Sequence, residues 1–203
     1  YCQKPETLTL REGPLMIAAA RRYGRIVSGG SQRVLGDYRK YVDPAWAGEF
    51  GTIKSINVNV GPLPQLCNLP EEAMNEKIDW DLWLGPAPFV PYDPFRCIYH
   101  FRWFWNYSGG QMTNWGAHNL DIARWALKAR APQAVTSFGG RYEIKDGGET
   151  PDVQEVIYQF PDCLVTWEGR EVNRQRDEYL VFHGTKGTLS IMRDGFSVVP
   201  EVW

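Results

Sequence analysis

The pattern of apolar and polar residues divides the chain into three parts. The first part predicts a strand, a helix and a second strand, because the short apolar runs Tyr1-Cys2 and 26–30 flank a segment with helical spacing. That helix has capping-box spacing at Thr9-x-x-Glu12 and a glycine, Gly24, where its end is expected. Two strands joined through a helix run parallel, so this part predicts the edge of a parallel sheet.

The second part is a long segment between two regions of regular structure. A helix is expected over residues 36–43, before Pro44, and a strand over residues 52–60. Residues 61–107 then combine seven prolines with a cluster of tryptophans and tyrosines. A disordered linker would be poor in aromatic residues, so we expect an ordered excursion. Its rings either pack onto the sheet or stack on a sugar or nicotinamide ring.

The third part, from Gln133 onward, alternates strands with short turns. The expected strands cover residues 134–144, 153–160, 163–171, 178–183, 188–192 and 196–199. Successive strands on tight turns form an antiparallel meander. One face of such a sheet needs cover, and a helix expected over residues 114–128 is the candidate.

A glycine-rich loop leads into that covering helix. Gly109-Gly110 loosens the backbone, and Thr113 and Asn114 are residue types that favour the N-cap position. At about 100° per residue, one arc of the helix carries Asn114, His118, Ile122 and Trp125, and another carries Asp121, Arg124 and Lys128. His118 is therefore expected beside Asn114, among apolar neighbours and away from the charged arc. The pair is either a small polar site or a core histidine with a capping asparagine.

Composition narrows the function classes. The chain has 203 residues, a net charge of −2 and no block of like charges, which argues against nucleic acid or an anionic membrane as the main partner. The four cysteines lack metal-site spacing, so no metal is indicated and buried reduced thiols are expected. The chain has no initiator methionine and stops on strand-like residues, which predicts a fragment cut at both ends.

Phosphate loops and hydrolase elbows are missing from the sequence. No G-x-G-x-x-G, Walker or G-x-S-x-G spacing occurs. Lys4 directly follows a buried strand, and Gln32 follows the next one. Ligands of parallel sheets bind outside the carboxyl ends of the strands, so both side chains are placed where a ligand crevice is expected.

Three motifs, taken in order, resemble the signature of the Gfo/Idh/MocA family of nicotinamide-dependent oxidoreductases. They are Gln3-Lys4-Pro5, then Gly30-Ser-Gln-Arg33, then Gly109-Gly110 followed by Asn114-x-x-x-His118-x-x-Asp121. Trp80-x-x-Trp83-Leu-Gly-Pro-Ala and Gly184-Thr-Lys-Gly-Thr-Leu189 fit the same resemblance. The resemblance covers essentially the whole chain.

The resemblance implies a fold and a domain division. The expected class is α/β, with α+β in the larger part: the end of a Rossmann-type parallel sheet, then a largely antiparallel open sheet covered by helices on one face. Residues 1–35 would be the C-terminal end of an incomplete dinucleotide-binding domain. Residues 36–203 would be a substrate-binding and oligomerisation domain, truncated at its C-terminus. The dinucleotide fingerprint would then lie upstream of Tyr1.

The resemblance also implies the site residues. Lys4 and His118 match the catalytic lysine and histidine of the family. Lys4, Pro5, Gln32 and Arg102 are the implied cofactor contacts, with Arg102 resting on the loosest alignment. Gln3 replaces the usual glutamate before the lysine, and Asn114 stands where an aspartate is common, so both positions lack a charge.

The implied activity is hydride transfer between NAD or NADP and a sugar, polyol or related cyclic alcohol. Lys4 would bond the reacting oxygen, His118 would accept its proton, and Asn114 would orient the substrate or His118. Two alternatives stay open: a glycoside-processing enzyme that keeps NAD bound for transient oxidation, and a redox-inactive relative that only binds a dinucleotide.

The resemblance further implies a carbohydrate-like small-molecule partner and a homo-oligomer formed through the sheet face. A cytoplasmic location is expected, although an export signal ahead of Tyr1 stays an open alternative. The fragment alone is expected to be inactive.

Overall fold

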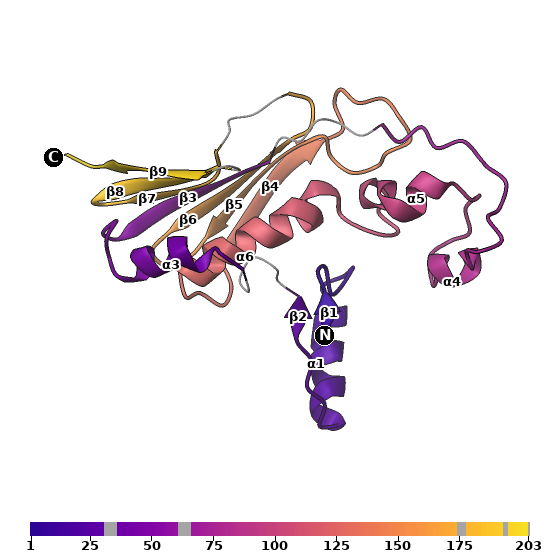
Figure 1. Ribbon diagram of the computed structural model, residues 1–203, viewed down its shortest axis with the longest axis horizontal. Helices are drawn as coiled ribbons and strands as arrows, with labels where there is room; N and C mark the ends of the chain where they lie inside the picture. Colours follow the sequence, from indigo (N-terminus) through magenta and orange to yellow (C-terminus); the bar gives the residue numbers. More distant parts are fainter. Residues whose placement is uncertain (31–35, 61–65, 174–177, 193–194, 203) are drawn as a thin grey trace.

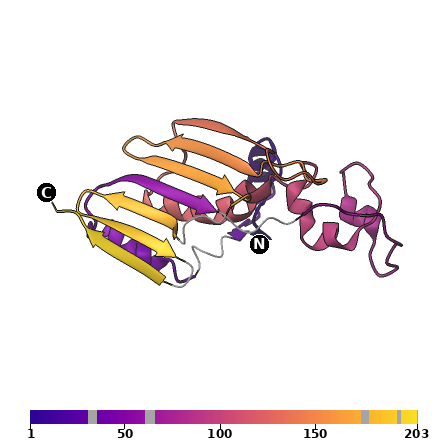
Figure 2. The same cartoon turned by 90° about the horizontal axis from the view of Figure 1, so that it is seen from above.

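The computed structural model describes residues 1–30, 36–60, 66–173, 178–192 and 195–202. A large sheet forms one layer, helices α3 and α6 lie along one of its faces, and a small unit of β1, α1 and β2 lies on the far side of α6 (Figure 1). Helices α4 and α5 lie beyond one end of the sheet (Figure 2). Among the described helices, none is both long and apolar enough to cross a membrane.

The N-terminal unit has the predicted strand, helix and strand. Strand β1 (Cys2–Gln3) pairs in parallel with β2 (Gly29–Gly30), and α1 (Glu12–Arg22) connects them. The second strand is shorter than the apolar run predicts. Gly24 has a φ of +58°, a value that glycine adopts without the steric cost of a side chain, and the helix ends just before it.

The start of α1 differs in detail from the predicted capping box. The helix begins at Glu12, and no side chain caps it from Arg11, its N-cap residue. Instead the Glu12 carboxylate accepts the backbone N–H groups of Leu8 (2.6 Å) and Thr9 (3.3 Å). These hydrogen bonds to the charged form lower the pKa of Glu12. Half of the capping box is therefore formed, from the glutamate side.

The main sheet has seven strands in the order β4-β5-β6-β3-β7-β8-β9. Their bounds are Ala134–Gly140 (β4), Val153–Gln159 (β5), Leu164–Arg170 (β6), Ile53–Val60 (β3), Glu178–Gly184 (β7), Gly187–Met192 (β8) and Gly195–Pro200 (β9). All neighbours are antiparallel except β3 and β6, which are parallel. The expected fold class is confirmed.

The expectation of a single meander was wrong at one position. Strands β4-β5-β6 and β7-β8-β9 are two separate meanders, and β3 lies between them. Residues 160–163 join β5 to β6 and residues 185–186 join β7 to β8, but the longer segment 141–152 joins β4 to β5. Strand β3 pairs in parallel with β6 and antiparallel with β7, so a strand from earlier in the chain separates the two meanders. A local reading of turns detects pairing between successive strands and misses a strand inserted between them.

The core lies between the sheet and two helices. From β3, Ile56 and Val58 are fully buried, and Ile122 and Ala123 of α6 (Ala117–Ala126) belong to the same apolar cluster. Burying an isoleucine side chain contributes about 1.5 to 3 kcal/mol, so this contact fixes α6 firmly against the central strand.

Helix α3 (Arg39–Trp46) passes through Pro44, so the expected stop at residue 43 was too early. Its last residue, Trp46, donates from Nε1 to the carbonyl of Ala126 at 3.0 Å and packs edge-on against Trp125. This contact with the neighbouring helix accompanies the extra turn after the proline.

Among the described residues, no helix covers the opposite face of the sheet, and the middle of that face is polar. A hollow of about 540 Å³ lies there, lined largely by amide, hydroxyl and charged groups of β3, β6, β7 and β8. Asn57 donates to Thr166 Oγ1 (2.7 Å), and its Oδ1 lies 2.6 Å from Nε2 of His183. Cross-strand side-chain pairs thus order this face even where it is open.

The described part of the excursion, residues 66–107, is ordered, as expected. It contains α4 (Trp80–Leu84), α5 (Pro94–Ile98) and the 3₁₀ turn η1 (His100–Trp103). Trp80 and Trp83 stack with ring centroids 4.6 Å apart, and Trp103 is buried. Packing thus accounts for these rings, whereas Trp105 remains 53% exposed.

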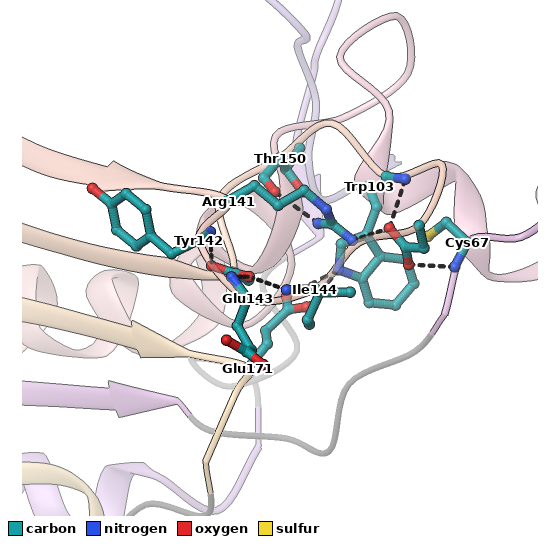
Figure 3. A network of polar contacts seen from close by, with 11 residues as sticks. Cys67, Trp103, Arg141, Tyr142, Glu143, Ile144, Thr150 and Glu171 are labelled. Carbon is teal, nitrogen blue, oxygen red and sulfur yellow. Dashed lines mark hydrogen bonds and ion pairs between the residues drawn. The ribbon is translucent and has the colours of Figure 1, made fainter.

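Buried polar groups tie the excursion to the segment between β4 and β5 (Figure 3). Arg141 forms an ion pair with Asp146 and donates to the carbonyl of Thr150 at 2.9 Å. Asp146 accepts the backbone N–H of Cys67 at 2.6 Å, and Trp103 Nε1 donates to the buried carboxylate of Glu171 at 2.9 Å. Strand β4 stops at Gly140 instead of 144 because Arg141 turns into this network.

Asp152 organises the same segment from the other side. Its carboxylate is buried and accepts the backbone N–H groups of Tyr142, Glu143 and Ile144 at 2.8 to 2.9 Å. Burial alone would raise the pKa of Asp152, but the three hydrogen bonds outweigh it and the pKa is lowered. Folding therefore gains stability from the charged carboxylate.

We predict that Asp152→Asn lowers the free energy of unfolding by about 2 to 4 kcal/mol at neutral pH, because an amide NH₂ would face backbone donors. Urea unfolding at several pH values measures this. A lowered folded-state pKa stabilises the fold above the unfolded value of about 3.9, so the difference should shrink as the pH falls below about 4. The control is Asp162→Asn, at an exposed turn. An equal loss in both variants would contradict the role of Asp152.

Candidate functional site

The site helix begins earlier than expected and contains a wider turn. Residues 112–116 form η2 (Met112–Gly116), a π-helical turn that leads directly into α6. Thr113 and Asn114 therefore lie inside the helical segment, and neither caps it. Thr113 Oγ1 instead accepts the N–H of Gly109 at 2.9 Å and lies 2.9 Å from Ser108 Oγ. Such turns are frequently found at functional sites in proteins.

Gly110 is the position where the loop needs a glycine. Its φ is +67°, and a Cβ added there would lie 2.8 Å from Thr150 Oγ1. A side chain would meet both strain and a buried neighbour, since Thr150 is fully buried. The segment between β4 and β5 thus holds the loop that precedes the site.

Lys4 joins the N-terminal unit to the π-helical turn. Its Nζ donates to the backbone carbonyl of Asn114 at 2.8 Å and to the side-chain Oδ1 of Asn114 at 3.0 Å. The Asn114 amide nitrogen donates in turn to Gln111 Oε1 at 3.3 Å, which turns Oδ1 toward the lysine. The structure thus brings together two residues that are 110 positions apart.

A cavity of about 400 Å³ opens beside this contact. Its lining consists of Lys4, Glu6, Gly29, Ala117, His118, Asp121, Arg124 and Trp125. Lys4 and His118, the two predicted catalytic residues, therefore share one cavity. Asn114 is not among the described lining residues, but it accepts two hydrogen bonds from Lys4, which is one of them.

The surroundings of His118 differ from those expected. It was predicted to lie away from the charged arc, but it shares the cavity with Asp121 and Arg124, which form an ion pair at 2.9 Å. At about 100° per residue, Asp121 lies about 60° to one side of His118 and the buried Ile122 about 40° to the other. His118 stands at the border between the core and the charged face, and it is half-buried.

A second, smaller cavity of about 190 Å³ lies next to the first and includes Pro5, Glu6, Gly109 and Thr113 in its lining. Pro5, an expected cofactor contact, therefore lines this second cavity and not the one that contains Lys4. Gln32 lies outside the described residues.

Arg102 is the predicted residue that the structure does not bring to this place. It belongs to η1, where Nη1 donates to the carbonyl of Tyr99 at 2.7 Å and the guanidinium lies over the Tyr99 ring. Burial lowers the pKa of Arg102. Neither cavity that contains Lys4 or Pro5 has Arg102 among its described lining residues.

Glu6 is a cavity residue to which the motifs assigned no role. It lines both cavities, and the signal that could have pointed to it is its place two residues after Lys4, at the end of a parallel strand. Two further lining residues had no predicted role: Asp121, which ends the motif that begins at Asn114, and Arg124, which was expected only on the charged arc of the helix.

The arrangement suits acid–base chemistry on a small polar molecule. An ammonium group can donate to an oxygen that gains negative charge, and a neighbouring imidazole can accept or return a proton near neutral pH. The cavity is within the size range of small-molecule sites. No cluster of three or more metal-ligating side chains occurs in the described part of the chain.

Comparisons with solved structures give the same architecture. An NAD-binding protein from Listeria innocua matches with a TM-score of 0.70 and 16% identity, over 99% of this chain and 49% of its own. The WlbA dehydrogenase from Chromobacterium violaceum, in complex with NADH and UDP-GlcNAcA, matches at 0.66 and 17%, over 93% of this chain and 47% of its own. The WlbA dehydrogenase from Bordetella pertussis matches with a TM-score of 0.66 and 17% identity, over 93% of this chain and 50% of its own. The chain thus spans about half the length of these structures.

Sequence comparison gives the family. No curated protein matches the chain. The family model described as "Oxidoreductase family, C-terminal alpha/beta domain", of the Gfo/Idh/MocA group, matches residues 64–190, more than half of the chain. This match shows that the chain belongs to the Gfo/Idh/MocA oxidoreductase family.

Proposed function

We propose that this chain forms the substrate side of an oxidoreductase that transfers a hydride between a nicotinamide cofactor and a sugar, polyol or related cyclic alcohol. The observation that carries the proposal is the shared cavity of Lys4 and His118, with Lys4 held by Asn114. The family match supports the reaction class. The relatives from Chromobacterium violaceum and Bordetella pertussis, which bind NADH and UDP-GlcNAcA, support the cofactor and suggest a sugar.

The residues around Lys4 fit a dinucleotide. Lys4 directly follows the carboxyl end of β1, where such ligands bind, and Gly29 of the neighbouring parallel strand β2 contributes a cavity wall without a side chain. On this chain, Lys4, Pro5 and Gln32 would hold NAD or NADP. The cofactor would supply the hydride acceptor or donor. The dinucleotide-binding role of residues 1–35 is part of this proposal.

Lys4 and His118 have distinct roles in the proposed reaction. The Lys4 ammonium donates a hydrogen bond to the reacting oxygen and stabilises its negative charge. The His118 imidazole accepts the hydroxyl proton during oxidation and returns it during reduction. Asn114 positions Lys4 through its two oxygen atoms, which refines the expectation that it orients substrate or His118.

The assembly that we propose is a homo-oligomer formed through the open face of the sheet. No helix of the described part of the chain covers that face, and polar side chains on it form pairs such as Asn57 and His183. A second copy could satisfy these groups across an interface. The proposed location of the protein is the cytoplasm.

We predict that Lys4→Ala, in the full-length protein, lowers kcat by about 100-fold or more with sugar or polyol substrates. The loss corresponds to about 2.7 kcal/mol of transition-state stabilisation. Steady-state kinetics at saturating cofactor measure kcat, so weaker cofactor binding does not contribute to this loss, and fluorescence titration measures the NADH affinity separately. His118→Ala should also lose activity.

Lys40→Ala, an exposed lysine on α3, is the matched control and should keep wild-type kinetics. Wild-type turnover in Lys4→Ala would refute the proposed role of the ammonium. Net hydrolysis of a glycoside without net cofactor turnover would favour the transient-oxidation alternative, and the absence of any reaction would favour a redox-inactive relative.

We also predict that Asn114→Asp raises the pKa of the Lys4 ammonium, because a carboxylate would stand about 3 Å from Nζ in place of the amide oxygen. The pKa of the His118 imidazole should rise in the same variant, and with it the apparent pKa of alcohol oxidation. NMR titration of the ε-carbon of lysine and of the three histidines measures both effects.

His100 and His183 serve as internal references in that titration. Asn59→Asp on β3 adds the same charge outside the Lys4 cavity, and His100 is the reference in that variant because Asn59 and His183 line the same hollow. Identical titration curves for Lys4 in wild type and Asn114→Asp would show that the contact between Lys4 and Asn114 does not persist in solution.

A further inference from the structure

Glu6 occupies an unusual place in the candidate site. It belongs to the lining of both the 400 Å³ cavity and the adjacent 190 Å³ cavity, so it stands where the two meet. It follows Lys4 by two residues, on the segment that leaves β1. None of the motifs that identify the family includes it.

Gly29 shows that the structure makes room for this carboxylate. A Cβ added at Gly29 would lie 2.5 Å from Glu6 Oε1, closer than any real contact of that kind. Gly29 also lines the larger cavity. The missing side chain on β2 therefore lets one oxygen of Glu6 lie against the backbone at the cavity wall.

Among the charged groups that line the cavity, Glu6 is separate from the ion pair of α6. The lining contains two cations, Lys4 and Arg124, and two carboxylates, Glu6 and Asp121. Arg124 donates to Asp121 at 2.9 Å, so these two charged residues of α6 form an ion pair with each other. Glu6 comes from the N-terminal unit, on the segment that follows β1.

We propose that Glu6 determines substrate specificity, by accepting hydrogen bonds from hydroxyl groups of a neutral sugar or polyol and by repelling anionic substrates. This inference rests on the proposed function of the cavity. A carboxylate is an acceptor with two oxygens, so adjacent hydroxyl groups match it well. A uronate or phosphorylated sugar would instead bring a like charge to the same wall.

The test compares neutral sugars with their matched uronates, for example glucose with glucuronate and galactose with galacturonate. Glu6→Gln keeps the size and one acceptor oxygen but removes the charge. In the full-length protein, we expect the ratio of kcat/KM for neutral sugar over uronate to fall about tenfold or more, mainly through KM. Glu49→Gln, an exposed glutamate that lines neither cavity, is the control.

Gly29→Ala tests position instead of charge. Its methyl group would displace the Glu6 carboxylate, so KM for the neutral sugar should rise although the charge remains. In the Glu6→Gln background the same substitution should have a clearly smaller effect, because the two changes act on one contact. Additive effects would mean that the methyl group acts directly on the substrate.

An unchanged ratio in Glu6→Gln would overturn the proposal. So would a change in NADH affinity without a change in sugar preference, because Glu6 would then face the cofactor. Calorimetric binding of the same sugar pairs separates the two proposals. Discrimination in binding without any hydride transfer would refute the reaction and keep the role of Glu6, whereas binding of neither member would overturn both.

Discussion

The packing of α6 beneath β3 is the constraint on which the site depends. Ile122 and Ala123 lie in the core against the central strand, so α6 has one permitted orientation. His118 lies about 40° around the helix axis from Ile122 and therefore stands at the border of the buried arc. Asp121 lies about 60° beyond His118, on the side away from Ile122. The catalytic geometry that we propose therefore needs no separate device to aim the imidazole, because the core already does so.

The other two parts of the chain meet this helix by polar contacts. Lys4 brings the N-terminal strands to the π-helical turn through two hydrogen bonds. Buried polar contacts hold the excursion: Arg141 pairs with Asp146, which accepts the N–H of Cys67, and Glu171 accepts from Trp103. Buried ionic groups of this kind add little stability over apolar packing, but each has defined partners and so favours one arrangement. This suits segments that must be placed accurately around a cavity.

Local patterns predicted much of the fold and less of the site. Alternation along β3 and glycine at residue 24 are signals within a few residues, and the elements they indicate are present. The insertion of β3 between β6 and β7 depends on pairing across more than 100 positions, which no local pattern contains. Resemblance found Lys4 and His118, and the structure places them in one cavity. Glu6 lies outside the motif, and the linings of the two cavities and the proximity of Gly29 reveal it.

The wide turn at residues 112–116 has an evolutionary consequence. A π-helical turn contains one residue more than the α-helical turn it replaces, and each residue rotates a helix by about 100°. Deleting one residue there would leave the hydrophobic contacts of α6 unchanged while turning Asn114 away from Lys4. A lineage could thus lose the attachment of Lys4 in a single small deletion and keep a stable fold. Members of the family that retain the architecture without the chemistry could arise by this route.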